Sequence, residues 1–200
     1  MGRRLRVPGP RDVRATLDGR DSPAVVVACP PHPGMGGDRS GPRLRAVSDA
    51  LGERGVDCLR VDCGPWDGGR GERTGVRSAL GWARGNYARV GLFGYSLGAS
   101  VALLAAAAAF RDGEDTPEAV SALAPAASIE GFDVAPAVDT VRCPLQVVYG
   151  ERDGTVDPEP VAERARQHGG TVETLGADHF FLGQQQRIGA LAAAFLPGRP

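Results

Sequence analysis

Short apolar runs recur along the 200-residue chain and alternate with longer amphipathic stretches. Short apolar runs bounded by turn residues are typical of strands that are buried on both faces of a parallel sheet. Strands of this kind are predicted at 24–29, 56–61, 90–93, 119–123, 145–149 and 171–175, after a first strand at 13–17. Length and spacing of apolar positions predict helices at 43–54, 73–86, 97–110, 158–168 and 184–196.

The alternation of strands and helices predicts an α/β fold with a doubly wound, mostly parallel sheet and helices on both faces. We expect residues 1–12 to form a loose arginine-rich arm, and residues 13–200 to form a single domain whose first strand, 13–17, lies at the sheet edge. The apolar stretch 97–110 is too short to span a membrane and is interpreted as a buried core helix. Because these elements use nearly the whole length, no lid domain is expected.

Composition narrows the possible functions. The chain has 42% apolar and 24% charged residues, which is typical of a soluble globular protein. Its 23 basic residues are interspersed with 24 acidic ones, so no basic patch for nucleic acid is predicted. All the basic residues are arginine, which excludes a Schiff-base lysine and a P-loop lysine.

The cysteines and the N-terminus indicate the compartment. Cysteines at 29, 58, 63 and 143 form no C-x-x-C pair and have no histidine at zinc-finger spacing, so we interpret all four as reduced and expect no metal. The basic residues at 3–6 are followed by Pro-Gly-Pro at 8–10, and no apolar signal segment follows. A cytoplasmic protein without a membrane partner is therefore expected.

The segment Gly94-Tyr95-Ser96-Leu97-Gly98 directly follows one predicted strand and precedes the most apolar predicted helix. A G-x-S-x-G motif in this context is typical of a nucleophile elbow, where a sharp turn exposes the serine hydroxyl. The glycines are needed because a Cβ on either side would collide with backbone. The helix that begins at this turn also points its N–H groups toward a developing oxyanion. Ser96 is the candidate nucleophile, and a simple helix N-cap is the alternative.

A serine hydroxyl needs a base to remove its proton. In the chain order that accompanies this motif, the serine comes first, the acid second and the histidine base last. His179 lies in the loop after the last predicted strand, at the carboxyl edge of the sheet where catalytic groups gather. His168 ends a predicted helix, where an imidazole interacts with the helix dipole. His179 is therefore the predicted base.

Three aspartates compete for the role of the acid that orients the base. Asp153 lies in the turn after the strand 145–149 and has no helix-capping duty, although an Asp-Gly turn also accounts for it. Asp157 precedes Pro158 and is interpreted as a helix N-cap. Asp178 is adjacent to His179, so their side chains diverge. Asp153 is the preferred acid.

An oxyanion needs a second donor besides the backbone N–H of Leu97. Three prolines in the loop after the strand 24–29 leave the N–H groups of His32, Gly34 and Met35 as candidates, with Gly34 as the first choice. The side chains predicted to contact substrate are those of His32, Met35, Tyr95 and Trp66. We expect an open cleft that favours short acyl groups, walled by the loops at 30–38, 63–72, 124–135 and 180–183.

Four segments together resemble motifs of the small α/β hydrolases related to dienelactone hydrolase. They are P-H-P-x-x-G-G at 31–37, G-Y-S-L-G at 94–98, G-E-R-D at 150–153 and G-A-D-H-F-F at 176–181. The resemblance extends from about residue 25 to residue 196. It implies a minimal α/β-hydrolase fold with Ser96, Asp153 and His179 as the catalytic triad.

The chain also departs from that family. Pro30 stands where members often carry a first histidine, and the loop 63–72 lacks their R-G-x-G-x-S-x-G pattern. Dienelactone hydrolase itself has a cysteine at the elbow, whereas this chain has Ser96. These differences argue against that particular enzyme.

Together these features predict a serine hydrolase that cleaves an ester or related acyl bond of a small substrate through an acyl-enzyme, without a cofactor. An acyltransferase or thioesterase with the same three residues is one alternative. A non-catalytic binding protein on the same scaffold is another, because fold does not fix function. The sequence determines neither the substrate nor the oligomeric state.

Overall fold

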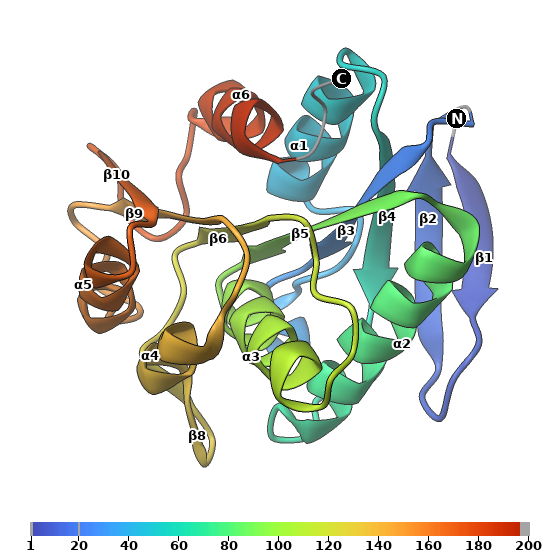
Figure 1. Cartoon of the computed structure of the whole chain (residues 1–200). Coiled ribbons are helices and arrows are strands. Elements are labelled where there is room, and N and C mark those ends of the chain that lie inside the picture. The colour runs from blue at the N-terminus through green and yellow to red at the C-terminus, as the bar shows by residue number, and fades with distance from the viewer. Residues whose placement is uncertain (1, 20, 197–200) are drawn as a thin grey trace.

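The computed structural model describes residues 2–19 and 21–196, which form an eight-stranded sheet with helices on both faces (Figure 1). The strands in sheet order are β1 (Arg3–Val7), β2 (Val13–Asp18), β4 (Asp57–Asp62), β3 (Ala24–Cys29), β5 (Arg89–Tyr95), β6 (Val120–Leu123), β9 (Leu145–Gly150) and β10 (Thr171–Leu175). The strands from β4 to β10 are parallel, and β1 and β2 add antiparallel pairs at one edge. The predicted mostly parallel sheet is confirmed.

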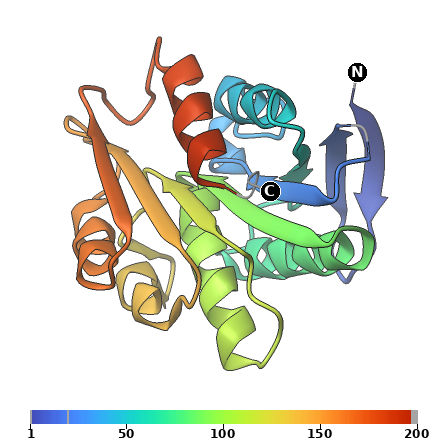
Figure 2. The same cartoon turned by 45° about the horizontal axis from the view of Figure 1, so that its top comes forward.

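The helices cover both faces of the sheet (Figures 1 and 2). One face carries α1 (Pro42–Gly52) and α6 (Gln185–Phe195). The other carries α2 (Arg70–Asn86), α3 (Leu97–Arg111), α4 (Val134–Ala137) and α5 (Glu159–Gln167). Strand β3 contributes alternate residues to the cores on its two sides and is buried throughout. Burial on both faces explains why the strands are almost continuously apolar in sequence.

The expectation of a loose arm over residues 1–12 is wrong, because Arg3–Val7 form β1 and pair antiparallel with β2. Strand β2 is consequently the second strand of the sheet and not its edge. Within β1, Val7 is buried and Leu5 is partly buried, whereas the arginines between and before them are exposed. The arginine content hides this alternation, and charged side chains are a common way to protect an edge strand.

Between β6 and β9 the chain forms short elements that the sequence did not predict. They are the hairpin β7 (Ser128–Ile129) and β8 (Phe132–Asp133), the helix α4, and the 3-10 helix η2 (Val138–Thr140). A further 3-10 helix, η1 (Pro33–Met35), follows β3. Elements of two to four residues are too short to show a periodicity. In the described ranges no insertion of domain size interrupts the alternation of strands and helices.

Helix α3 is the core helix that the apolar stretch 97–110 predicted, and its residues 97–109 are all buried. Across the described residues, no helix has both the length and the apolar character needed to cross a membrane. The four cysteines are free thiols, as expected.

Candidate active site

Ser96 lies at the turn between β5 and α3, with φ 56° and ψ −120°. These angles are rare for a residue with a side chain and store strain at the turn. A Cβ at Gly94 would come within 2.2 Å of the Gly98 carbonyl oxygen, and one at Gly98 within 2.4 Å of the Cys29 carbonyl oxygen. The turn is therefore possible only with glycine at both positions, as the motif predicted.

His179 follows β10 and reaches back to the turn after β5. Its Nε2 lies 2.9 Å from the Oγ of Ser96, and the residue is only 4% exposed. The Tyr95 hydroxyl donates a hydrogen bond of 2.9 Å to the His179 carbonyl oxygen. Burial raises the pKa of Tyr95, so its hydroxyl stays protonated and keeps this bond at neutral pH. The phenol of Tyr95 thus fixes the backbone that carries the imidazole.

Asp153 lies in the turn after β9. It is the third side chain of the site, after Ser96 and His179. Its Oδ2 lies 2.7 Å from the Nδ1 of His179. Its Oδ1 accepts hydrogen bonds from the backbone N–H groups of Thr155 and Val156, at 3.0 and 3.1 Å. A Cβ at Gly150 would come within 2.5 Å of the Ala177 carbonyl oxygen, so the two loops meet only because glycine is there. Both carboxylate oxygens are thereby held in place for the imidazole.

The competing histidine lies elsewhere. His168 is the C-cap of α5, and its Nε2 is 3.0 Å from the Oδ1 of Asp139. This places His168 in an exposed pair at the end of a helix, as its sequence position indicated.

The competing aspartates also have other partners. The Oδ1 of Asp157 accepts from the Glu159 N–H at 3.3 Å, while the N-cap of α5 is Pro158, one residue later than predicted. The Oδ1 of Asp178 accepts from the Phe180 N–H at 2.9 Å. Asp178 therefore turns away from the neighbouring imidazole.

The expectation that Gly34 offers a free N–H is wrong. Its N–H donates to the Nδ1 of His32 at 3.0 Å, because η1 folds the His32 ring over its own first turn. The N–H groups of Met35 and Gly37 both donate to the His32 carbonyl oxygen, and that of Gly36 donates to a proline carbonyl. The prolines of the segment have no N–H. In the described part of the chain, His32 therefore has the one N–H of residues 30–37 without a hydrogen bond.

A cavity of about 480 Å³ opens at Ser96 and His179. Its walls include the four side chains that were predicted to contact substrate, those of His32, Met35, Tyr95 and Trp66. The rings of His32 and Trp66 are in contact, with centroids 4.5 Å apart and planes tilted by 46°, and together they form one wall. The predicted loops contribute Pro31, His32, residues 35–38, Trp66, Ala126, residues 128–130 and Phe180.

Sequence reasoning missed several contributors to this cavity. The first turn of α1 lines it through residues 41–44, among them Arg43, whose guanidinium carbon lies 5.7 Å from the centre of the Tyr95 ring. Thr155 and Val156 line it as well, and their proximity to Asp153 in sequence could have indicated this. Ser100 accepts a hydrogen bond of 3.0 Å from the Ala126 N–H and fixes the loop after β6. No pattern in the sequence signals the roles of Arg43 and Ser100.

Comparisons with known proteins agree with this architecture. No protein-family model matches the sequence, and no curated protein sequence matches it either. Among solved structures, an α/β serine hydrolase without a lid from Xanthomonas campestris has a TM-score of 0.78 at 24% identity, over 100% of this chain and 97% of that one. Est1E from Butyrivibrio proteoclasticus with ferulic acid bound has a TM-score of 0.82 at 18% identity, over 96% and 97%.

A dienelactone hydrolase from Anabaena variabilis has a TM-score of 0.76 at 20% identity, over 98% of this chain and 96% of that one. At these identities the matches establish the fold. The resemblance seen in the motifs is thus confirmed at the level of fold, which is the minimal α/β-hydrolase fold without a lid.

Proposed function

We propose that this chain, which has the fold of the lid-less α/β serine hydrolases, cleaves an ester or related acyl bond of a small substrate through an acyl-enzyme. The observation that carries the proposal is the unbroken chain of hydrogen-bond contacts from the Ser96 Oγ through the His179 imidazole to the Asp153 carboxylate. This is the arrangement that acyl transfer by a serine needs, with a nucleophile, a base in contact with it and an acid that orients the base.

The proposed reaction has two halves. The Ser96 Oγ attacks the carbonyl carbon while its proton passes to the Nε2 of His179, and the Asp153 carboxylate stabilises the imidazolium. The imidazolium then gives that proton to the leaving alcohol as the ester C–O bond breaks, which leaves an acyl-serine. In the second half a water molecule attacks the acyl-serine with the same imidazole as base, and the acid product leaves.

The negative charge on the carbonyl oxygen needs donors that are already in place. We assign the first donor to the N–H of Leu97, at the start of α3, where the helix dipole also favours a negative charge. We assign the second to the N–H of His32, because each other N–H of residues 30–37 is absent or engaged in a hydrogen bond. Both residues line the cavity at Ser96.

The cavity suits a small, partly aromatic ester. The tilted His32 and Trp66 rings give its wall an aromatic surface, and the Phe180 ring makes an edge contact with the His179 ring. A structural neighbour, Est1E, binds ferulic acid, a compound of this size and character. The proposed substrate class is therefore small esters with a short acyl or aryl group.

Labelling with a fluorophosphonate probe tests the proposal without knowledge of the substrate, because only an activated serine reacts. The native protein should be labelled and Ser96→Ala should not, with circular dichroism as the check that the variant is folded. Labelling of Ser96→Ala at the native rate would show that another residue reacts and would refute the assignment. Product analysis with added alcohol then distinguishes hydrolysis from acyl transfer.

A further inference from the structure

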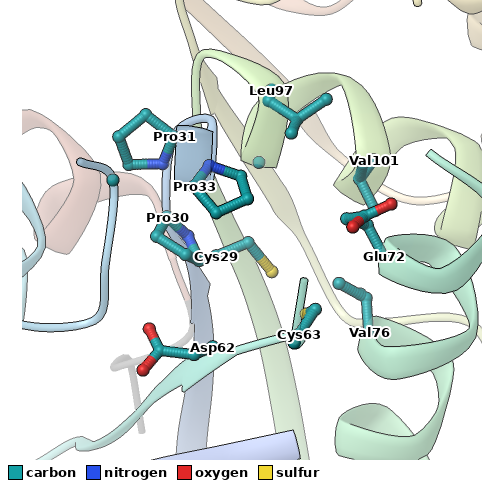
Figure 3. A pocket seen from close by; sticks show the side chains of 13 residues that line it. Cys29, Pro30, Pro31, Pro33, Asp62, Cys63, Glu72, Val76, Leu97 and Val101 are labelled. Carbon is teal, nitrogen blue, oxygen red and sulfur yellow. The ribbon is translucent and has the colours of Figure 1, made fainter. Parts of the chain in front are cut away.

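A second, smaller pocket adjoins the catalytic cavity between the loop after β3 and the helices α2 and α3 (Figure 3). It measures about 40 Å³. Pro31, Gly37 and Leu97 line both this pocket and the catalytic cavity, so the two spaces are neighbours. Most of its other walls are apolar: Figure 3 shows prolines, valines and two cysteine side chains around it.

One polar group in this pocket lacks a partner. Glu72 is 5% exposed and lines the pocket, and its Oε2 is buried without a hydrogen bond in the described part of the chain. Its Oε1 accepts from the Asp67 N–H at 3.2 Å, and Arg11 Nη2 lies 3.7 Å from the same oxygen. Buried carboxylate oxygens without a partner are costly and rare, so Oε2 requires a donor from outside the protein.

The walls of the pocket do not supply that donor. Burial raises the pKa of Cys29, and it raises the pKa of Cys63 to about 12, so both thiols are neutral and only weak donors. The carboxylate of Asp62 is already paired with Arg39. The described residues also contain no group of three histidine, cysteine or acidic side chains that could hold a metal ion.

We infer that this pocket is a subsite for a short acyl group that ends in a hydroxyl, which donates a hydrogen bond to the Oε2 of Glu72. The inference rests on the proposed function and specifies its substrate class. A single water molecule needs about 10–15 Å³ of such space, so the pocket holds about three water-sized groups and fits a hydroxymethyl group. Longer groups have room only in the catalytic cavity.

The geometry of the reaction places the acyl side of the substrate here. Leu97, whose N–H is assigned to the carbonyl oxygen, lines the pocket, so the acyl carbon bonded to that carbonyl lies beside it. His179, which must protonate the leaving alcohol, lines the catalytic cavity and not this pocket. The alcohol therefore leaves on the opposite side.

Charge selects a neutral hydroxyl over other groups. An ammonium group would lose its hydration in a pocket with mostly apolar walls, and the one free carboxylate oxygen of Glu72 would satisfy only one of its three N–H donors. A carboxylate on the substrate would be repelled by Glu72. A hydroxyl satisfies the free oxygen of Glu72 without adding charge.

The test compares phenyl esters of glycolate and fluoroacetate, which have similar size but differ in the hydroxyl donor; fluorine also withdraws electrons more strongly, so each rate is divided by the rate of hydroxide-catalysed hydrolysis. With kcat/KM divided by the hydroxide-catalysed rate of each ester, we expect the native protein to favour the glycolyl ester about tenfold. A preference of this size corresponds to the free energy of one hydrogen bond to a charged acceptor. In Glu72→Gln the side chain can still accept the hydrogen bond from the Asp67 N–H, but it presents an amide NH₂ to the pocket in place of a carboxylate oxygen. The preference for the glycolyl ester should then fall to about one.

Two further variants control this experiment. Glu114→Gln removes an exposed carboxylate that is also paired with an arginine, Arg77, and should leave the preference unchanged. Val76→Ile adds a methylene to the pocket wall, which should keep the hydroxymethyl group out of the pocket and remove the preference for the glycolyl ester. This variant tests the inference if Glu72→Gln does not fold. Equal rates for both esters with the native protein, or an unchanged preference in folded Glu72→Gln, would overturn the inference.

A binding experiment separates this inference from the proposed function. If neither ester is hydrolysed and no probe reacts, the proposed function fails, and the pocket is judged by a crystal structure of Ser96→Ala with methyl glycolate. The ligand hydroxyl within hydrogen-bond distance of the Glu72 Oε2 supports the subsite. Water alone at that position, with methyl glycolate bound elsewhere or not bound, overturns it.

Discussion

The Oδ2 of Asp153 lies 2.7 Å from the Nδ1 of His179, and the side chains are only 1% and 5% exposed. Two loops that follow different strands, β9 and β10, meet to make this contact. Because water is excluded from it, the carboxylate can hold one tautomer of the imidazole and stabilise the imidazolium.

Asp153→Asn should therefore lower turnover by up to about 10⁴-fold, since an amide favours the wrong tautomer of the histidine. Asp157→Asn is the matched control, because an asparagine can keep the hydrogen bond to the Glu159 N–H and should leave turnover nearly unchanged. Steady-state kinetics on one p-nitrophenyl ester compares the two variants. Equal losses in both would mean that Asp153 has no special role.

The two histidines provide a second matched pair. His179→Ala removes the base and should reduce turnover by orders of magnitude, without a comparable loss of folding. His168→Ala breaks only an exposed contact with Asp139 at the end of α5, so turnover should change little. A reversed pattern in the same assay would show that His168 is the base.

The strained turn at Ser96 predicts a conflict between stability and activity. Its φ of 56° and ψ of −120° are accessible to glycine at little cost. Ser96→Gly should therefore raise the free energy of unfolding by about 1 kcal/mol while activity is lost. Ser96→Ala keeps the strain and should show no such gain. Urea unfolding of both variants measures this, and a less stable Ser96→Gly would contradict the strain argument.

The open cavity predicts a preference for short acyl chains. Each buried methylene of the acyl chain contributes about 0.8 kcal/mol to binding of the transition state. This gain stops where the acyl chain extends beyond the walls of the cavity into water. The kcat/KM of p-nitrophenyl esters should peak at roughly two to four carbons and then fall or level off. A steady rise from acetate to palmitate would reveal an acyl tunnel and would exclude the open cleft.

Buried thiols predict a loss of stability at alkaline pH. Burial raises the pKa of Cys58 and Cys63 from 9.0 to about 12, whereas both titrate near the lower value in the unfolded chain. The contribution of these thiols to the free energy of unfolding is therefore complete below pH 9. It is lost between pH 9 and 12, by about 1.4 kcal/mol per pH unit for each thiol.

Urea midpoints of the native protein at pH 8 and pH 10 measure this effect. Cys58→Ala removes one of the thiols, and its midpoint should fall less between the two pH values than that of the native protein. Identical midpoints of the native protein at pH 8 and pH 10 would contradict the prediction.

Some properties of this protein could be read from local sequence because they depend on local physics. Parallel strands covered on both faces need continuous apolar runs, so β3, β5 and β9 were located within two residues at each end. The sharp turn at Ser96 tolerates only glycine at positions 94 and 98, and this leaves a fixed motif. The order of strands then places His179 and Asp153 at the same edge of the sheet.

Other properties were decided only by the tertiary structure. Which N–H of the loop after β3 stays free depends on the fold of η1, which directs the His32 ring onto the N–H of Gly34. The entry of Arg43 into the wall of the cavity, and the unpaired Oε2 of Glu72, depend on how separate elements pack. Periodicity reports which face of an element is buried, and motifs report close backbone contacts. Neither reports which polar atoms find a partner, since those partners come from distant parts of the chain.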